Sequence, residues 1–177
     1  MKKARVATLW LDGCSGCHMS FLDLDERLLE IAPLIELVFS PVVDAKEFPE
    51  DVDLTLVEGA LANEEDIRKI LKVRSRTKLL AALGDCAVTG NVPAMRNSFV
   101  LEDVLRCGYV ENATANPGPP TKEVPKLERK VIPLHELVKV DLFIPGCPPS
   151  AGLIHFVLSE ILAGRTPDLA TKCRFGN

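Results

Sequence analysis

The sequence at residues 9–18 reads LWLDGCSGCH and carries the first two of four cysteines around which the chain is organised. An apolar run ends at Asp12, and two thiols, Cys14 and Cys17, follow at the spacing C-x-x-C. Two more thiols have similar settings: LLAALGDC ends at Cys86, and VDLFIPGC ends at Cys147. In each case an apolar run typical of a buried strand stops near a glycine, and a cysteine follows. We therefore expect a metal or redox site built from loops at one edge of a sheet.

Composition limits the classes of protein to which this chain can belong. Its 177 residues, 47% of them hydrophobic, suffice for one compact domain, so we expect residues 1–177 to form a single domain. The net charge of −4 and the few aromatic residues argue against a nucleic-acid surface. No apolar run approaches the ~18–20 residues of a membrane span. The apolar run behind the basic start is also shorter than the ~7–15 residues of a signal peptide.

These observations predict a cytoplasmic protein without a membrane span or a nucleic-acid partner. In that compartment, six cysteines are not expected to form a disulfide framework.

Short apolar segments alternate with segments of helical periodicity. We expect strands at residues 5–11, 34–39, 53–57, 78–83 and 141–144. We expect helices at residues 20–32, 63–74 and 151–162. The proline-rich stretch at about 88–133 is predicted to be a long irregular excursion with a short helix at 99–106, and the tail at 165–177 to be loosely structured.

This alternation predicts an α/β fold, a doubly wound parallel sheet of the flavodoxin type. Ligands of such sheets bind outside the carboxyl ends of the strands. The predicted strands one, three, four and five end at Cys14 and Cys17, at Glu58, at Cys86 and at Cys147, respectively. The chemically interesting residues therefore share one edge of the sheet.

Spacing alone leaves several interpretations of the cysteines open. A C-x-x-C pair with two remote cysteines provides the four thiolates that an iron–sulfur cubane needs. A four-thiolate zinc site, a thioredoxin-like dithiol and buried core thiols are alternatives. Outside the pattern, we expect Cys107 to be a packed thiol and Cys173 to be free.

For three other polar residues, a structural role has to be weighed against a functional one. His18 is expected to be an N-terminal helical residue rather than a ligand, and His155 to be structural. Glu58 ends a strand at the cysteine edge, where a carboxylate could relay protons or serve as a hydrogen-bonded structural group.

Four motifs together resemble the small subunit of nickel–iron hydrogenases. They are LDGCSGC at 11–17, VEGA at 57–60, GDCAVTG at 84–90 and PGCPP at 145–149. The resemblance extends over residues 6–162. In the sequence CHMSF at 17–21, the chain is most similar to the short small subunit of cytoplasmic NAD-linked, bidirectional hydrogenases.

The resemblance implies a flavodoxin-like fold that holds one 4Fe–4S cluster, proximal to a nickel–iron centre on a separate large subunit. It implies that Cys14, Cys17, Cys86 and Cys147 are the cluster ligands and that Glu58 belongs to a proton path. It also implies that electrons pass to iron–sulfur and flavin subunits of a diaphorase module. FMN is a further candidate cofactor.

Positions that differ from related families indicate the type of cluster and the family. Oxygen-tolerant members have two extra cysteines where this chain has Gly16 and Asn91, so an ordinary cubane is expected. The alternative is the homologous cluster subunit of respiratory NADH:quinone oxidoreductase, but that family has adjacent cysteines where Ser15 and Gly16 separate the two thiols here. A flavin-binding electron carrier is disfavoured, because cysteines replace the Ser/Thr-rich phosphate loop after the first strand.

Overall fold

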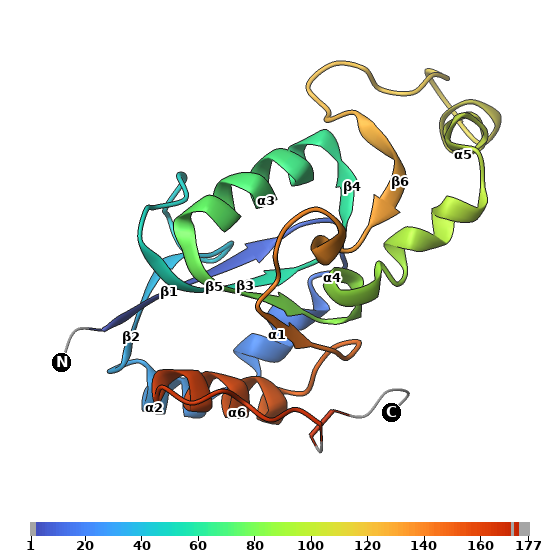
Figure 1. Ribbon diagram of the computed structural model, residues 1–177. Helices are drawn as coiled ribbons and strands as arrows, with labels where there is room; N and C mark the ends of the chain where they lie inside the picture. The colour runs from blue at the N-terminus through green and yellow to red at the C-terminus, as the bar shows by residue number, and fades with distance from the viewer. Residues whose placement is uncertain (1–2, 171, 174–177) are drawn as a thin grey trace.

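A five-stranded parallel sheet forms the centre of the molecule (Figure 1). The computed structural model describes residues 3–170 and 172–173. The strands, in spatial order, are β2 (Ile35–Phe39), β1 (Ala4–Trp10), β3 (Val52–Glu58), β5 (Thr77–Leu83) and β7 (Leu142–Ile144). This is the flavodoxin-type order, with the reversal of direction between β1 and β3. The predicted α/β fold is confirmed, with strand ends shifted by a residue or so.

The strands are in register at their carboxyl ends. Trp10, the last residue of β1, pairs with Glu58 of β3, and Glu58 pairs with Leu83 of β5. Leu83 in turn pairs with Ile144, the last residue of β7. The loops that follow these four strands therefore leave the sheet at the same level.

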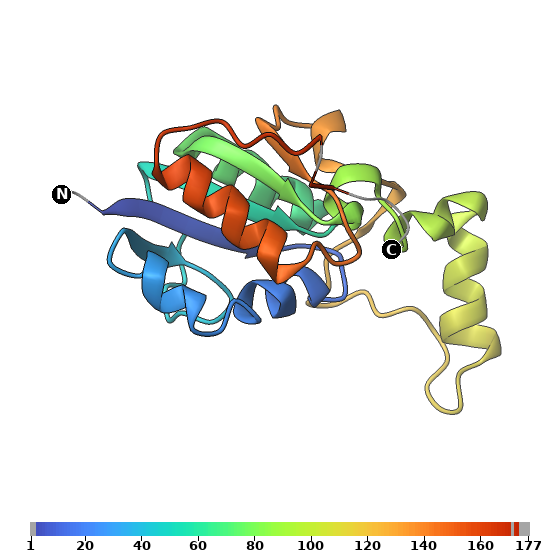
Figure 2. The same ribbon diagram turned by 90° about the horizontal axis from the view of Figure 1, so that it is seen from below.

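Helices cover both faces of the sheet, and each face has its own core (Figures 1 and 2). On one face lies α3 (Glu64–Arg76), which buries Ile70 and Val73. On the other face lie α1 (Gly16–Leu22), α2 (Arg27–Ile31) and α6 (Ala151–Leu162). From α6, Ile154, Val157 and Leu158 are almost completely buried, and each such burial stabilises the fold by roughly 1.5–3 kcal/mol.

Local capping explains the ends of the two longer helices. The Asn63 side chain accepts hydrogen bonds from the backbone amides of Glu65 and Asp66 at the start of α3. Ser150 does the same for the amide of Leu153 at the start of α6, which has the predicted bounds. Arg74 and Arg76 in the last turn of α3 complement the negative end of its dipole.

The helix expected at residues 20–32 is wrong in its extent. The structure has two short helices there, and Asp25 between them has a φ of +49°, which is incompatible with a continuous helix. The first of them, α1, begins at Gly16, so it includes Cys17 and His18 in its first turn. The apolar periodicity did not reveal this early start, because glycine and cysteine carry little helical signal.

The excursion is more ordered than expected. After α4 (Asp85–Thr89) it contains η1 (Pro93–Ser98), α5 (Leu101–Arg106) and the π-helical turn η2 (Cys107–Glu111). It ends in β6 (Leu127–Ile132), which pairs antiparallel with β4 (Leu61–Asn63), and η3 (Leu134–Glu136) follows. The short helix predicted at 99–106 is thus present as α5.

The segment α5–η2 projects from the body of the molecule (Figure 2). Cys107, the first residue of η2, is exposed there, so the prediction of a packed thiol is wrong.

The sequence predicts a loosely structured C-terminal tail and no membrane span. The described residues 165–170 and 172–173 form neither helix nor strand, and the rest of the tail lies outside the described residues. Within the described part of the chain, no helix has the length and apolar character that crossing a membrane requires.

Candidate functional site

The four thiols singled out by the sequence lie in the loops and first helical turns at the carboxyl edge of the sheet. Cys14 follows β1 and is exposed, whereas Cys17 is buried in the first turn of α1. Cys86 is half-buried in α4, and Cys147 is exposed after β7. All four are free thiols.

Burial and neighbouring charges oppose ionisation of the two less exposed thiols. Burial raises the pKa of Cys17, and the charges of Glu58, Cys86, Cys14 and Cys147 raise it further. Burial also raises the pKa of Cys86, and Cys147 and Cys14 add to the rise. Such interactions fall off with distance, so the field of the other thiols reaches Cys17. As thiolates the four groups would repel one another unless a positive group lay among them.

Gly84 gives the buried thiol its space. A Cβ atom at this position would lie 2.2 Å from the Cys17 Sγ, far inside van der Waals contact. The φ of Gly84 is also +83°, which side chains rarely adopt. Both observations require glycine where β5 passes into α4.

Hydrogen bonds tie the thiol-bearing loops to one another. The Asp85 carboxylate accepts from the Gly146 amide at 2.7 Å, and the Asp85 amide donates to the Gly146 carbonyl at 2.9 Å. The Ser20 hydroxyl of α1 donates to the Pro149 carbonyl at 2.5 Å. The loop that carries Cys147, which includes a cis Cys147–Pro148 peptide, is thus fixed to the elements that carry Cys86 and Cys17.

Glu58 ends β3 as a buried carboxylate, 2% exposed, beside the thiols. Its Oε2 accepts from the His18 backbone amide at 2.7 Å and lies 2.6 Å from the His18 Nδ1. Ser15, at the N-cap position of α1, makes no side-chain capping bond, so Glu58 caps this helix from the sheet.

The sequence prediction placed His18 correctly near a helix start but missed its bond to Glu58. His18 and Glu58 are 40 residues apart in the chain, and no local pattern links them. The His18 Nε2 is buried and has no hydrogen-bond partner within the described chain.

Cys107, Cys173 and His155 do not belong to the loops that carry the four thiols. Cys107 is on η2, and Cys173 is half-buried beyond α6. His155 lies on α6 with its Nε2 3.3 Å from Glu30 of α2, which agrees with a structural role.

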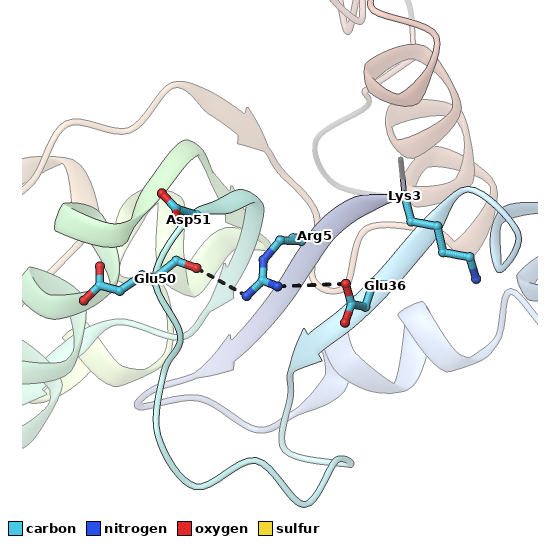
Figure 3. A pocket seen from close by; sticks show the side chains of 5 residues that line it. All are labelled: Lys3, Arg5, Glu36, Glu50 and Asp51. Carbon is cyan, nitrogen blue, oxygen red and sulfur yellow. Dashed lines mark hydrogen bonds and ion pairs between the residues drawn. The ribbon is translucent and has the colours of Figure 1, made fainter. Parts of the chain in front are cut away.

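Two hollows near the sheet differ in character. One of about 570 Å³ lies at the amino ends of the strands, opposite to the thiols; it is lined by Lys3, Arg5, Glu36, Glu50 and Asp51 (Figure 3). Arg5 is already paired there with the Glu50 carbonyl at 3.3 Å and the Glu36 carboxylate at 3.9 Å. A smaller, mostly apolar groove of about 180 Å³ borders the C-x-x-C loop and is lined in part by Trp10, Met19 and Val42.

The donor set fits an iron–sulfur cluster. Four free thiols converge on one edge, and glycine stands where a side chain would collide with a sulfur. A cubane takes four thiolate ligands. Among the described residues, no three His, Cys, Asp or Glu side chains are arranged to hold a single metal ion.

Comparison with known proteins agrees with this geometry. Residues 14–161 match the family described as NADH ubiquinone oxidoreductase, 20 Kd subunit. Over 175 residues the chain is 45% identical to the NAD-reducing hydrogenase HoxS subunit delta of Cupriavidus necator, covering 96% of this chain and 84% of that protein.

An archaeal protein and a solved structure are also similar. The chain is 42% identical over 170 residues to a subunit of the vhu F420-non-reducing hydrogenase of Methanocaldococcus jannaschii, covering 95% of this chain and 59% of that longer protein. A crystal structure of an NAD+-reducing [NiFe]-hydrogenase in the H2-reduced state contains a chain with a TM-score of 0.93 and 39% identity. That match covers 98% of this chain and 99% of the other.

The fold, a parallel sheet with four thiols at its carboxyl edge, defines an α/β protein of the flavodoxin type. The chain belongs to the family of the NADH ubiquinone oxidoreductase 20 kDa subunit, and within it to the small subunits of nickel–iron hydrogenases. The predicted resemblance to NAD-linked hydrogenases is confirmed, and the chain is a subunit of an enzyme complex.

The contact between Gly84 and Cys17 predicts an unusually costly glycine substitution. Gly164 has a similar φ of +73°, but a Cβ there would meet nothing within 4 Å. Gly164→Ala should cost about 1–2 kcal/mol through backbone strain alone. Gly84→Ala should cost about 1–3 kcal/mol more, because the new methyl group displaces the Cys17 sulfur. Urea unfolding of both variants measures the difference, and equal losses would show that the contact is unimportant.

Proposed function

We propose that this chain is the electron-transfer subunit of a cytoplasmic NAD-linked nickel–iron hydrogenase. In this proposal one 4Fe–4S cluster, held by Cys14, Cys17, Cys86 and Cys147, lies between the hydrogen-activating centre of a large subunit and a diaphorase module. The observation that supports it best is the shared register of four strand ends, since three of the loops that follow them carry these thiols. Assignment to a hydrogenase that uses NAD is supported by the relatives described above, which are named as NAD-reducing hydrogenases.

The chain's own residues have separate tasks in this proposal. When bound, a cubane supplies a carrier that accepts and returns one electron at a time. The thiols hold it, Gly84 leaves room beside Cys17, and the Asp85–Gly146 bonds keep two ligand loops at a fixed separation. Burial of Cys17 excludes water from one side of the site.

The proposal predicts the metal content of the protein. Anaerobically isolated protein should contain about four iron and four sulfide per copy of this chain, after the contribution of other subunits is subtracted. Serine at Cys14, Cys17, Cys86 or Cys147 should abolish or convert the cluster, because it removes a thiolate ligand. Iron and sulfide analysis with electron paramagnetic resonance (EPR) of the reduced protein measures both results.

Serine at Cys107 or Cys173 provides the matched control, since these thiols lie outside the four sequence motifs and should be dispensable. About one zinc per chain with no visible absorption would contradict the cluster proposal. Flavin released from this chain, after separation from its partners, would establish FMN as a second cofactor.

The alternative is a subunit of a respiratory NADH:quinone oxidoreductase-like complex, and the description of the matching family supports it. The separation of Cys14 from Cys17 by two residues favours hydrogenase. Reduction of NAD by hydrogen gas, catalysed by the isolated complex, would decide for hydrogenase; NADH-dependent quinone reduction without hydrogen turnover would decide for the alternative.

We propose that the large subunit covers the thiol edge. Cys14 and Cys147 are exposed there, and electron exchange with a centre on another chain needs close approach. Exposed apolar side chains accompany these thiols, including Trp10, which is 46% exposed, and Met95 of η1, which is 68% exposed. Apolar surface of this kind is typical of a protein interface.

Met95→Glu should therefore prevent the large subunit from co-purifying. A carboxylate buried in an apolar interface is expected to weaken association at least about tenfold. Leu29→Glu is the matched control, because Leu29 is 74% exposed on α2, away from the thiols. Quantitative pull-down with the tagged chain measures both. Normal recovery of the large subunit with Met95→Glu would contradict this placement of the partner.

We also propose that Glu58 handles protons beside the active centre rather than binding iron. Four thiols already complete the coordination of a cubane. The Glu58 carboxylate contacts the Nδ1 atom of His18, so the path of polar groups continues into the imidazole ring. The other ring nitrogen, Nε2, has no hydrogen-bond partner within the described chain. The competing role is purely structural, because Glu58 also caps α1.

Glu58→Gln separates these roles. The amide oxygen can still accept from the His18 backbone amide, while the exchangeable proton of the carboxyl group is lost. If protons pass through Glu58, hydrogen turnover should fall about 100-fold or more, with cluster content and assembly unchanged. Asp66→Asn is the control, since it neutralises another buried carboxylate outside the site. Unchanged turnover would make Glu58 structural, and failed assembly would assign it to the interface.

A further inference from the structure

The sulfur of Cys147 has a hydrogen-bond donor from outside the ligand loops. The side-chain amide of Asn91 donates from Nδ2 to the Cys147 Sγ at 3.4 Å, across 56 residues of sequence. A thiolate accepts hydrogen bonds and cannot donate them, so the amide nitrogen rather than the amide oxygen belongs against this sulfur. Neither Asn91 nor this contact has a task in the function proposed above.

The backbone aims Asn91 at the sulfur. Gly90 ends α4 with a φ of +86°, and Asn91 follows with a φ of +33°. This part of conformational space is uncommon for side chains but is tolerated by asparagine. The two positive φ values turn the chain back over the thiol edge, and the Ala94 amide closes the turn by donating to the carbonyls of Gly90 and Asn91.

The turn is anchored from its far side as well. Arg96 of η1 donates to the carbonyls of Ala62 and Glu128 at 2.9 Å, which fixes η1 to the β4–β6 sheet. Asn97 exchanges two hydrogen bonds of 2.8 Å with the backbone of Val131 in β6. The segment that follows Asn91 is therefore braced against the β4–β6 sheet.

We propose that Asn91 raises the reduction potential of the cluster by donating a hydrogen bond to the Cys147 sulfur. This inference rests on the proposed cluster ligation. Reduction adds one electron to the cluster and its sulfurs, so a donor aimed at a sulfur stabilises the reduced form more than the oxidised form. Hydrogen bonds to the sulfurs are one of the factors that set the potentials of iron–sulfur clusters.

Two substitutions at Asn91 should lower the potential in a defined order. Asn91→Gly removes the donor and suits the positive φ, so it adds no backbone strain. Asn91→Asp also tolerates this φ, but it replaces the donor with a negative charge. We expect the potential to fall from wild type to Asn91→Gly and to fall further in Asn91→Asp. For Asn91→Gly, the reduced-to-oxidised ratio at a fixed ambient potential should drop up to about tenfold, equivalent to about 59 mV for one electron.

The measurement is an EPR-monitored redox titration of the complex as isolated. The signal of this cluster is assigned as the one that Cys147→Ser removes or alters. Asn112→Asp is the matched control, because the Asn112 Nδ2 makes the same type of contact, at 3.3 Å, with the non-ligand Cys107. Asn112→Asp adds the same charge as Asn91→Asp and should leave the potential unchanged.

The possible failures are distinguishable. Wild-type protein without iron and sulfide would overturn the cluster proposal itself. Cluster-loaded Asn91 variants with the wild-type potential would overturn only the role of Asn91. If neither variant retains its cluster, wild-type protein labelled with ¹⁵N-asparagine decides. Its reduced cluster should show a hyperfine coupling to one ¹⁵N nucleus, and the absence of that coupling would refute the hydrogen bond.

Discussion

The carboxyl edge of the parallel sheet brings four thiols and the buried Glu58 together, and this crowding disfavours a negative charge on Cys17. Burial, Glu58 and the other three thiols all oppose ionisation of Cys17. The chain nevertheless collects these groups, because β1, β5 and β7 end in register and a cysteine closely follows each end. A site that concentrates like charges is stable when a positive group lies among them, and the irons of a four-thiolate cluster meet that condition.

Polar groups around the thiols form hydrogen bonds that connect the thiol-bearing loops. Glu58 caps α1 from β3, Asp85 is bonded to the loop of Cys147, and Ser20 joins α1 to the same loop. Each of these bonds connects segments that lie far apart in the sequence. Together they keep the thiol-bearing loops at fixed separations, which suits the electron transfer proposed for this edge. The projecting α5–η2 segment lies outside this braced region (Figure 2).

Local sequence signals predicted the sheet and the edge of thiols, because buried strands, helix caps and glycine stops are encoded within a few residues. The signals failed where structure depends on distant partners. The strand β6 is polar at Glu128, Arg129 and Lys130, and it forms through its pairing with β4, more than sixty residues earlier. The bond between His18 and Glu58 and the exposure of Cys107 likewise depend on tertiary arrangement. The roles of the thiols came from the resemblance, because spacing alone left zinc and dithiol interpretations open.

Binding of one multinuclear iron cluster by the four thiols can be observed by anomalous diffraction from crystals of the anaerobic complex, recorded on both sides of the iron absorption edge. We expect a single strong anomalous peak enclosed by the sulfurs of Cys14, Cys17, Cys86 and Cys147, present above the iron edge and greatly weakened below it. A peak that responds only at the zinc edge, or disulfide density between these cysteines, would show that the four thiols do not bind an iron cluster.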